Sequence, residues 1–251
     1  MSALDIILAE APRFYSWWNL RFLLIAVGNT LLASIAGCAI GYALGFALAL
    51  ARLPQLVPLA AIRILAILWV EAFRRIPFLV LLLLVFFAAQ FAKLEAPLAA
   101  IAIAAVAIRM SALAAENVRA GLEGVRPTQW EAALTMNIAP WTVLGRIVLP
   151  QAWRVILPPS IVHVLSMVKE TSLVSQIGFI EITFAAKMLT QRGFSALLTY
   201  GTALILYFIV SFALAAFGRW LERRLIPDRG DRDRSPPQSP APASAGLAAR
   251  H

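Results

Sequence analysis

Residues 22–50 read FLLIAVGNTLLASIAGCAIGYALGFALAL, and no Asp, Glu, Lys or Arg occurs among them. A helix of that length extends about 44 Å at 1.5 Å per residue. The hydrocarbon core of a bilayer is only about 30 Å thick, so the run can cross it even when tilted. The stretch therefore predicts a membrane-spanning helix.

Small residues recur at every fourth position of this stretch, at Ala33, Gly37, Gly41, Gly45 and Ala49. Residues four apart share one face of a helix, and small side chains there let a second helix approach closely. We therefore assign Gly37, Gly41 and Gly45 to a helix-packing face. The alternative is the general enrichment of Gly in membrane helices.

The composition places the whole chain in a membrane. Hydrophobic residues make up 61% of the 251 residues, charged residues 14%, and the mean hydropathy is +0.80, which leaves too little polar surface for a soluble globule. We expect an all-α fold, a multi-pass transmembrane helical bundle of about five spans over residues 1–226. The expected spans are Phe22–Leu50, Ile62–Ala92, Ala96–Ala115, Val155–Leu173 and Leu197–Gly218.

The second expected span is irregular because Arg74, Arg75 and Pro77 interrupt it. The uncharged run from Phe78 to Ala92 alone reaches only about 22 Å, so the span must include residues before Pro77. A re-entrant pair of half-helices is the alternative, and it would reverse the orientation of everything downstream. In the third span we expect Arg109 to face the bundle interior or a lipid headgroup.

The net charge of +9 reflects membrane topology and not nucleic-acid binding, because Lys and Arg are spread over loops and helix ends. Most of them fall in the segments that are cytoplasmic if the N-terminus lies outside. The positive-inside rule therefore favours an outer N-terminus and a cytoplasmic C-terminus. Residues 227–251 alternate charges and prolines with little apolar content, which predicts a disordered cytoplasmic tail.

The cytoplasmic loop at about residues 120–150 contains a predicted helical hairpin. Thr128 and Glu131 have the spacing of a capping box, which predicts a helix from Gln129. Asn137 tolerates left-handed backbone angles and so suits a sharp turn. A second short helix is then expected from Pro140.

Two interpretations of this hairpin follow from periodicity. It is either an amphipathic hairpin on the membrane surface or a docking element for a soluble partner. In the second case Ala132 and Ala133 keep one helix surface shallow enough to enter a cleft.

The segment Glu131-Ala132-Ala133, followed by a turn and by Ile147-Val148-Leu149-Pro150, resembles the EAA loop of permease subunits of binding-protein-dependent ABC importers. Other segments resemble the polar amino acid branch of that family in the same order, namely Gly28–Leu31, Glu71–Pro77, Ala115–Gly121 and Val168–Leu173. Two departures stand out. The family usually has glycine at Asn137 and Gly-Thr at Arg75-Ile76.

The resemblance implies the type I permease architecture and a permease of the bacterial inner membrane for a polar amino acid or similar solute. It also implies cytoplasmic ATPase subunits that contact Glu131, Ala132, Ala133 and Asn137, a second permease subunit, and an external solute-binding protein. The chain has no Gly-x-x-x-x-Gly-Lys-Ser/Thr loop, so we expect a transport subunit without its own ATPase site and without a cofactor. Membrane lipid completes the expected partners, and nucleic acid is not among them.

Polar residues within the fourth span, Lys169, Glu170, Thr171 and Ser172, are candidates for the solute path, because charges there are costly unless paired, hydrated or used. A pair of Lys169 and Glu170 that ends the helix is the alternative. We expect Glu116 and Arg119 to pair, three residues apart on one helix face. His163 has no ligand-type neighbour at suitable spacing, so we expect a hydrogen-bonded packing residue and no metal site.

A secondary transporter driven by an ion gradient is the competing function. It predicts inverted repeats, and five spans divide poorly into two halves. A membrane sensor or assembly protein is a third hypothesis, which does not explain a capped loop helix without an attached soluble domain.

Overall fold

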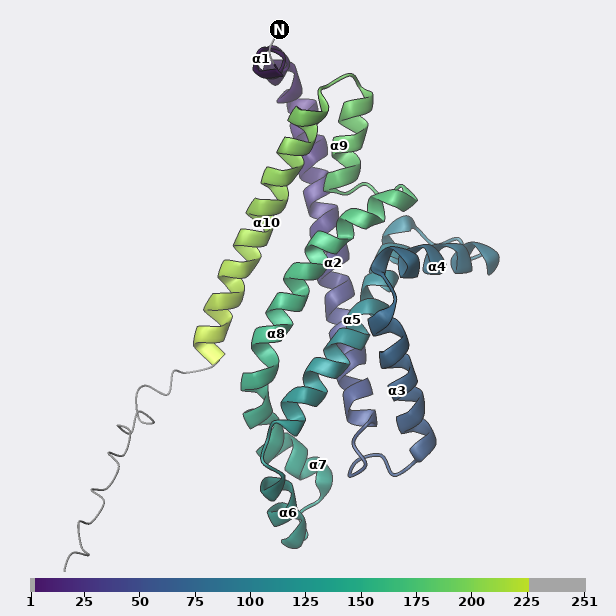
Figure 1. Cartoon of the computed structure of the whole chain (residues 1–251), viewed down its shortest axis with the longest axis vertical. Helices are drawn as coiled ribbons and strands as arrows, with labels where there is room; N and C mark the ends of the chain where they lie inside the picture. Colours follow the sequence, from purple (N-terminus) through teal and green to yellow (C-terminus); the bar gives the residue numbers. More distant parts are fainter. Residues whose placement is uncertain (1–2, 226–251) are drawn as a thin grey trace, which may run out of the picture.

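The computed structural model describes residues 3–225, and within that range the chain is helical with no strand (Figure 1). The predicted all-α class is therefore confirmed. The tail predicted at residues 227–251 lies outside the described residues.

Ten α-helices, one π-helical turn and one 3₁₀ helix make up this part of the chain. Their bounds are α1 Ala3–Phe14, α2 Trp17–Ala51, α3 Ala60–Arg75, α4 Phe78–Phe91, α5 Leu98–Glu123, α6 Pro127–Thr135, α7 Pro140–Val143, the π turn Leu144–Val148, α8 Leu149–Glu170, the 3₁₀ helix Thr171–Ile177, α9 Ile182–Gln191 and α10 Ala196–Leu225. Four helical segments are long and apolar enough to cross a membrane, and α3 together with α4 forms a fifth candidate.

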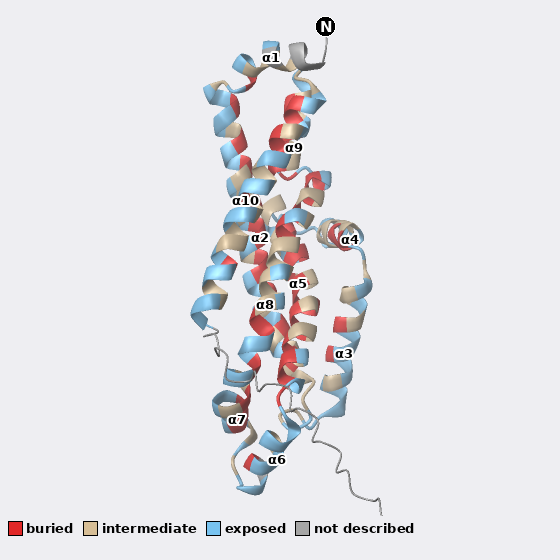
Figure 2. Ribbon diagram, turned by 60° about the vertical axis from the view of Figure 1, so that its left-hand side comes forward, coloured by how far each residue is buried: buried red, intermediate tan, exposed pale blue. Residues whose placement is uncertain are grey.

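The long helices run along one axis in alternating directions (Figure 1). The helices α2, α5 and α10 run toward the end of the bundle where α6 and α7 lie, which we name the elbow end. The helix α8 runs back from it, and α1 and α9 lie at the opposite end. Figure 2 shows buried positions along the facing sides of the central helices and exposed positions on their outer sides.

The centre of the bundle is the contact between α2 and α5. A Cβ built on Gly37, Gly41 or Gly45 would lie within 2.5–2.6 Å of a side-chain carbon of α5, closer than any side chain can approach. The α5 residues at these positions are Val106, Met110 and Ala114. Glycine therefore permits a helix separation that a larger residue would prevent.

A second close approach joins α5 to α8. A Cβ on Gly121 would lie 2.3 Å from the Cγ1 atom of Ile156. The central helix α5 is thus held against α2 along one side and against α8 near its C-terminal end.

The second span is not one straight helix. The axes of α3 and α4 differ by 113° across the break at Ile76 and Pro77, where an irregular span was expected, and the two helices together count as one candidate span. Proline cannot donate the backbone hydrogen bond that would continue α3. In Figure 1, α3 rises from the elbow end, α4 projects sideways from the bundle, and α5 returns to the elbow end, so α5 runs opposite to α3, as expected for a crossing.

Arg109 of α5 stabilises this break. Its Nη1 atom donates to the main-chain oxygens of Phe73 at 2.9 Å and of Arg74 at 2.8 Å. These carbonyls belong to the last turn of α3 and have no partner within that helix. Arg109 therefore faces the bundle interior, one of its two expected positions, and pairs carbonyls that a lipid environment would leave unsatisfied.

Two helices at the end opposite the elbow had no counterpart in the expected spans. The helix α1 lies before the first span, and the exposed Trp17 and Trp18 follow it. The helix α9 has 10 residues, which reach about 15 Å and are too few to cross a membrane. It packs Ile182, Ala185 and Leu189 against α2 and α10.

Candidate functional site

The elbow consists of α6 and α7 at one end of the bundle, and its first helix begins two residues earlier than predicted. Pro127 occupies the start of α6, with Thr128 and Gln129 already in its first turn. Because α6 begins at Pro127, Thr128 lies inside the helix and is not its N-cap residue, so the predicted capping box is wrong. The fixed φ of Pro127 is suited to the first helical position, which explains the earlier start.

The turn between the two elbow helices is confirmed at Asn137, whose φ is +58°. The amide of Ile138 donates to the carbonyl of Ala133 at 3.1 Å across this residue. A left-handed residue bridged by such a bond closes the C-terminus of α6 as a Schellman motif. The second elbow helix then begins at Pro140, as predicted.

The elbow presents one side to solvent and anchors the other. Glu131 and Ala132 are exposed, whereas Ala133 is only 4% exposed and packs in a cluster with Val143 and Val148. Trp141 is 59% exposed, so it does not share the buried face on which Val148 lies. The exposed Glu131 and Ala132 are therefore free to meet another surface.

The elbow continues into α8 without a break. The amide of Leu149 donates to the carbonyl of Leu144, five residues back, as in a π-helical turn. The helix therefore does not end at Leu149-Pro150. Pro150 lies just after the π-helical turn, at the beginning of α8.

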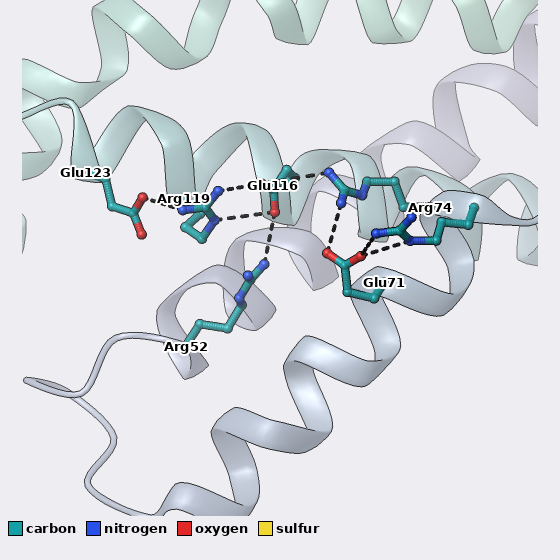
Figure 3. A network of polar contacts seen from close by, with 7 residues as sticks. Arg52, Glu71, Arg74, Glu116, Arg119 and Glu123 are labelled. Carbon is teal, nitrogen blue, oxygen red and sulfur yellow. Dashed lines mark hydrogen bonds and ion pairs between the residues drawn. The ribbon is translucent and has the colours of Figure 1, made fainter.

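An ionic network links α2, α3 and α5 near the elbow end (Figure 3). The carboxylate of Glu116 accepts from Arg119 at 2.5 Å and from Arg52 at 3.1 Å, and Arg74 lies 3.9 Å from it. Arg119 also pairs with Glu123. The predicted pair of Glu116 and Arg119 is confirmed, and the structure adds partners from two other helices.

The same network continues along α3. Glu71 pairs with Arg74 at 2.9 Å and with Arg75 at 2.6 Å. Since Arg74 also approaches Glu116, it joins the last turn of α3 to α5. Arg52 and Glu116 are 64 positions apart in the sequence, so their contact had no local sequence signal.

The four solute-path candidates lie where α8 gives way to a 3₁₀ helix, and they differ in accessibility. Lys169 is exposed, Glu170 and Ser172 are half-buried, and Thr171 is buried with its hydroxyl bonded to the carbonyl of Val168 at 2.6 Å. Lys169 and Glu170 form no ion pair in the described structure. The alternative of a pair that closes the helix is therefore not supported.

Three buried polar atoms in this region have no hydrogen-bond partner among the described residues: Nε of Arg109, Nδ1 of His163 and Oε2 of Glu170. The charge of Arg109 is close enough to act on both His163 and Glu170. Buried polar atoms without a partner are rare in folded proteins and require a physical explanation. The expectation that His163 is a hydrogen-bonded packing residue is not met at Nδ1.

At the opposite end, the fully buried Glu181 caps α9. Its carboxylate accepts from the amides of Thr183 at 2.9 Å and Phe184 at 2.7 Å, and from the hydroxyl of Tyr207 at 2.5 Å. Burial raises the pKa of Glu181 above its ordinary value, against the opposing effect of these donors. The role of Glu181 has no local sequence signal, because glutamate is not a typical N-cap residue.

Two further bonds tie this connection to α2. The amide of Ile182 donates to the hydroxyl oxygen of Thr30 at 3.3 Å, and the Asn29 side chain donates to the carbonyl of Ile180 at 2.8 Å. The segment before α9 is thus fixed between α2 and α10. In the part of the chain that the structure describes, no three His, Cys, Asp or Glu side chains are grouped as metal ligands.

The profile of the family described as "Binding-protein-dependent transport system inner membrane component" matches residues 41–227. The probable amino-acid ABC transporter permease protein YckA of Bacillus subtilis is 29% identical over 203 residues, which cover 81% of this chain and 88% of that protein. The octopine transport system permease protein OccM of Rhizobium radiobacter is 32% identical over 224 residues, covering 86% of this chain and 90% of that protein.

Solved structures have the same fold. The crystal structure of an amino acid ABC transporter with histidines matches with a TM-score of 0.73 and 28% identity, covering 85% of this chain and 97% of that one. The inward facing methionine ABC transporter MetNI matches with a TM-score of 0.72, covering 84% of this chain and 99% of that one. At 20% identity the second match concerns the fold alone.

Proposed function

The chain belongs to the family of binding-protein-dependent transport system inner membrane components, and we propose from this that it moves a polar amino acid or a similar small solute. Relatives named for amino acids, L-cystine and octopine support this solute class. An external binding protein delivers the solute, and a separate ATPase supplies the energy.

The observation that carries the proposal is the elbow. It presents Glu131 and Ala132 to solvent while Ala133 anchors it to the bundle. It also runs without a break into α8, which contains Lys169 and Glu170. A partner that moves the elbow would therefore move the helix that carries the candidate solute path.

The proposed orientation has the N-terminus outside and the elbow in the cytoplasm, in the bacterial inner membrane. It is supported by the excess of arginine in the segments near the elbow end, among them Arg52, Arg74, Arg119 and Arg223. The direction of the helices is compatible, because α2, α5 and α10 all run toward that end (Figure 1).

The proposed solute path passes Glu170, whose Oε2 atom is buried without a partner. A carboxylate in this state suits the ammonium group of an amino acid, and the nearby Arg109 suits a carboxylate. Thr171 and Lys169 have weaker support, since the Thr171 hydroxyl is already bonded and Lys169 is exposed.

A single bundle of this size provides only part of an importer. We therefore include a second permease subunit, of the same or a similar chain, and two ATPase subunits at the elbows. Each ATPase is expected to contact the exposed Glu131, Ala132 and Asn137, whereas the buried Ala133 holds the helix against the bundle.

Purification of the full chain from its own membranes tests the proposal. We expect an ATPase subunit to co-purify in a fixed ratio and the reconstituted complex to accumulate an amino acid only with ATP and a binding protein. Accumulation by the purified chain alone, driven by an ion gradient, would instead establish a secondary transporter.

A further inference from the structure

An apolar groove with a volume of about 540 Å³ opens between α2, α8 and α10, and its lining includes no residue of the ionic network or of the candidate solute path. Tyr42 and Ser160 are the hydroxyl-bearing residues of its wall, which is otherwise carbon-rich. The walls include Phe46 of α2, Trp153 and Leu157 of α8, and Leu214 and Phe217 of α10.

The groove exists because α10 packs closely over only part of its length. Near its N-terminal end, Leu198 and Ala203 are buried against α2 and α9. Beyond Val210, Gly218 is the one buried residue of the described part of α10. It touches α8 so closely that a Cβ there would lie 2.4 Å from Cγ2 of Ile161.

The length of the groove matches one leaflet of a membrane. It extends from Ile35 to Phe46 along α2, which is about 16 Å, and from Trp153 to Leu165 along α8, which is about 18 Å. Half of the roughly 30 Å hydrocarbon core is about 15 Å. An acyl chain of one leaflet therefore fits along it.

The groove ends beside a group of exposed cations at the end of α10. Leu221 lines the groove, and Arg224 is the next residue on the same helix face, three positions on. Arg219 and Arg223 are exposed beside it, and the half-buried Glu222 is the one acid in this turn. On the opposite wall, the exposed Arg154 directly follows Trp153.

We propose that this groove binds an anionic phospholipid, with one acyl chain along α2, α8 and α10 and its phosphate against the arginines at the end of α10. The two parts of the site match the two parts of such a lipid, since apolar walls bind the acyl chain and basic residues at the membrane surface attract the headgroup. A zwitterionic solute does not fit the groove, because its charges would lie unpaired against carbon.

The test uses the full chain, with whatever subunits co-purify, in nanodiscs of phosphatidylcholine that contain a photoactivatable phosphatidylglycerol. We expect crosslinks to peptides of α2, α8 and α10 that line the groove. An excess of unlabelled phosphatidylglycerol should compete for them, and an equal excess of phosphatidylcholine should not.

Two pairs of variants test the acyl-chain site and the headgroup site separately. Ala43→Trp places a large side chain in the groove and should abolish these crosslinks, whereas Ala47→Trp, at an exposed position outside the groove on the same helix, should preserve them. Arg224→Gln should lower the preference for phosphatidylglycerol about fivefold, as expected for one cation near the surface. Arg21→Gln, at the other end of α2, is its control.

Equal competition by phosphatidylcholine would overturn the proposal. Crosslinking of the groove to a second polypeptide in place of lipid would also overturn it, because the groove would then be a subunit contact. The Arg224→Gln pair keeps the test decisive if Ala43→Trp fails to fold, since Arg224 is exposed and its replacement removes no core packing.

Discussion

Gly41 of α2 lies so close to Met110 of α5 that a Cβ on Gly41 would stand 2.5 Å from the Cβ of Met110. Gly41→Val should therefore separate the two central helices and lower the free energy of unfolding by about 1–3 kcal/mol, as overpacking does. Thermal unfolding in detergent measures the effect. The control is Gly28→Val on the same helix, where a Cβ meets nothing within 4 Å. Equal stability of the two variants would contradict the prediction.

Arg109→Met should loosen the break between α3 and α4. The change removes the donor to the carbonyls of Phe73 and Arg74, and each buried carbonyl left unpaired costs about 1–3 kcal/mol. Hydrogen exchange at the start of α4 should rise, and Arg109→Lys should restore part of the protection. Unchanged exchange in Arg109→Met would show that the arginine does not support the break. Arg75→Met, at an exposed position, serves as the control.

Glu131→Arg should leave the protein in the membrane, because the side chain is exposed, yet separate ATP hydrolysis from uptake in the assembled importer. Gln129→Arg places the same cationic side chain about 200° around α6 and should retain uptake. Paired measurements of ATPase activity and solute uptake in proteoliposomes distinguish the two variants. Normal uptake by Glu131→Arg would remove this residue from the coupling mechanism.

Glu170→Gln should weaken solute uptake, because it removes a charge at a buried atom that lacks a partner. Lys169→Gln, at the neighbouring exposed position, should change uptake little. The Michaelis constant for uptake into proteoliposomes is the appropriate measurement. If the two variants behave alike, Glu170 is not part of the solute path.

Glu181 should make stability depend on pH. Burial raises the pKa of Glu181 in the folded protein. The contribution of Glu181 to the free energy of unfolding is therefore fully present below its unfolded pKa of about 4.3, and it is lost as the pH rises through its pKa in the folded protein. Glu181→Gln should therefore gain stability relative to the unmodified chain as the pH rises above about 4.3. Thermal unfolding between pH 4 and 8 measures this difference. A difference that stays constant with pH would refute it.

Tyr207→Phe provides a second check on the same site. Loss of the hydroxyl that donates to Glu181 removes one group favouring the ionised carboxylate, so the pH-dependent loss of stability should move to higher pH. A shift to lower pH would contradict the assigned hydrogen bond.

Features that depend on local sequence were predictable. The uncharged run at residues 22–50 forms α2, Asn137 adopts the left-handed turn, and Glu116 pairs with Arg119 three residues away. In each case residues adjacent along the chain or on one helix face determine the outcome. The family resemblance added what local patterns could not, the placement of the elbow in a known kind of transporter.

Features that depend on contacts distant in sequence were not predictable from one chain. The 113° bend is stabilised by Arg109, more than 30 positions away, and the cap of α9 involves Tyr207 on α10. The capping box failed for a local reason, since the motif at Thr128 competes with the preference of Pro127 for the first helical position. A motif therefore marks a helix start less reliably when a proline precedes it.

The continuous helical segment from α7 into α8 connects the elbow mechanically to the candidate solute path. Residues 140–177 form one 38-residue helical segment without a loop, and Ile156, packed against Gly121, lies near its midpoint. The arm from Pro140 to Ile156 is about 24 Å and the arm from Ile156 to Glu170 about 21 Å. A displacement of about 1 Å at α7, turned about this contact, would move Glu170 by nearly as much in the opposite direction, less any bending at Pro158 and Pro159, which lie between Ile156 and Glu170.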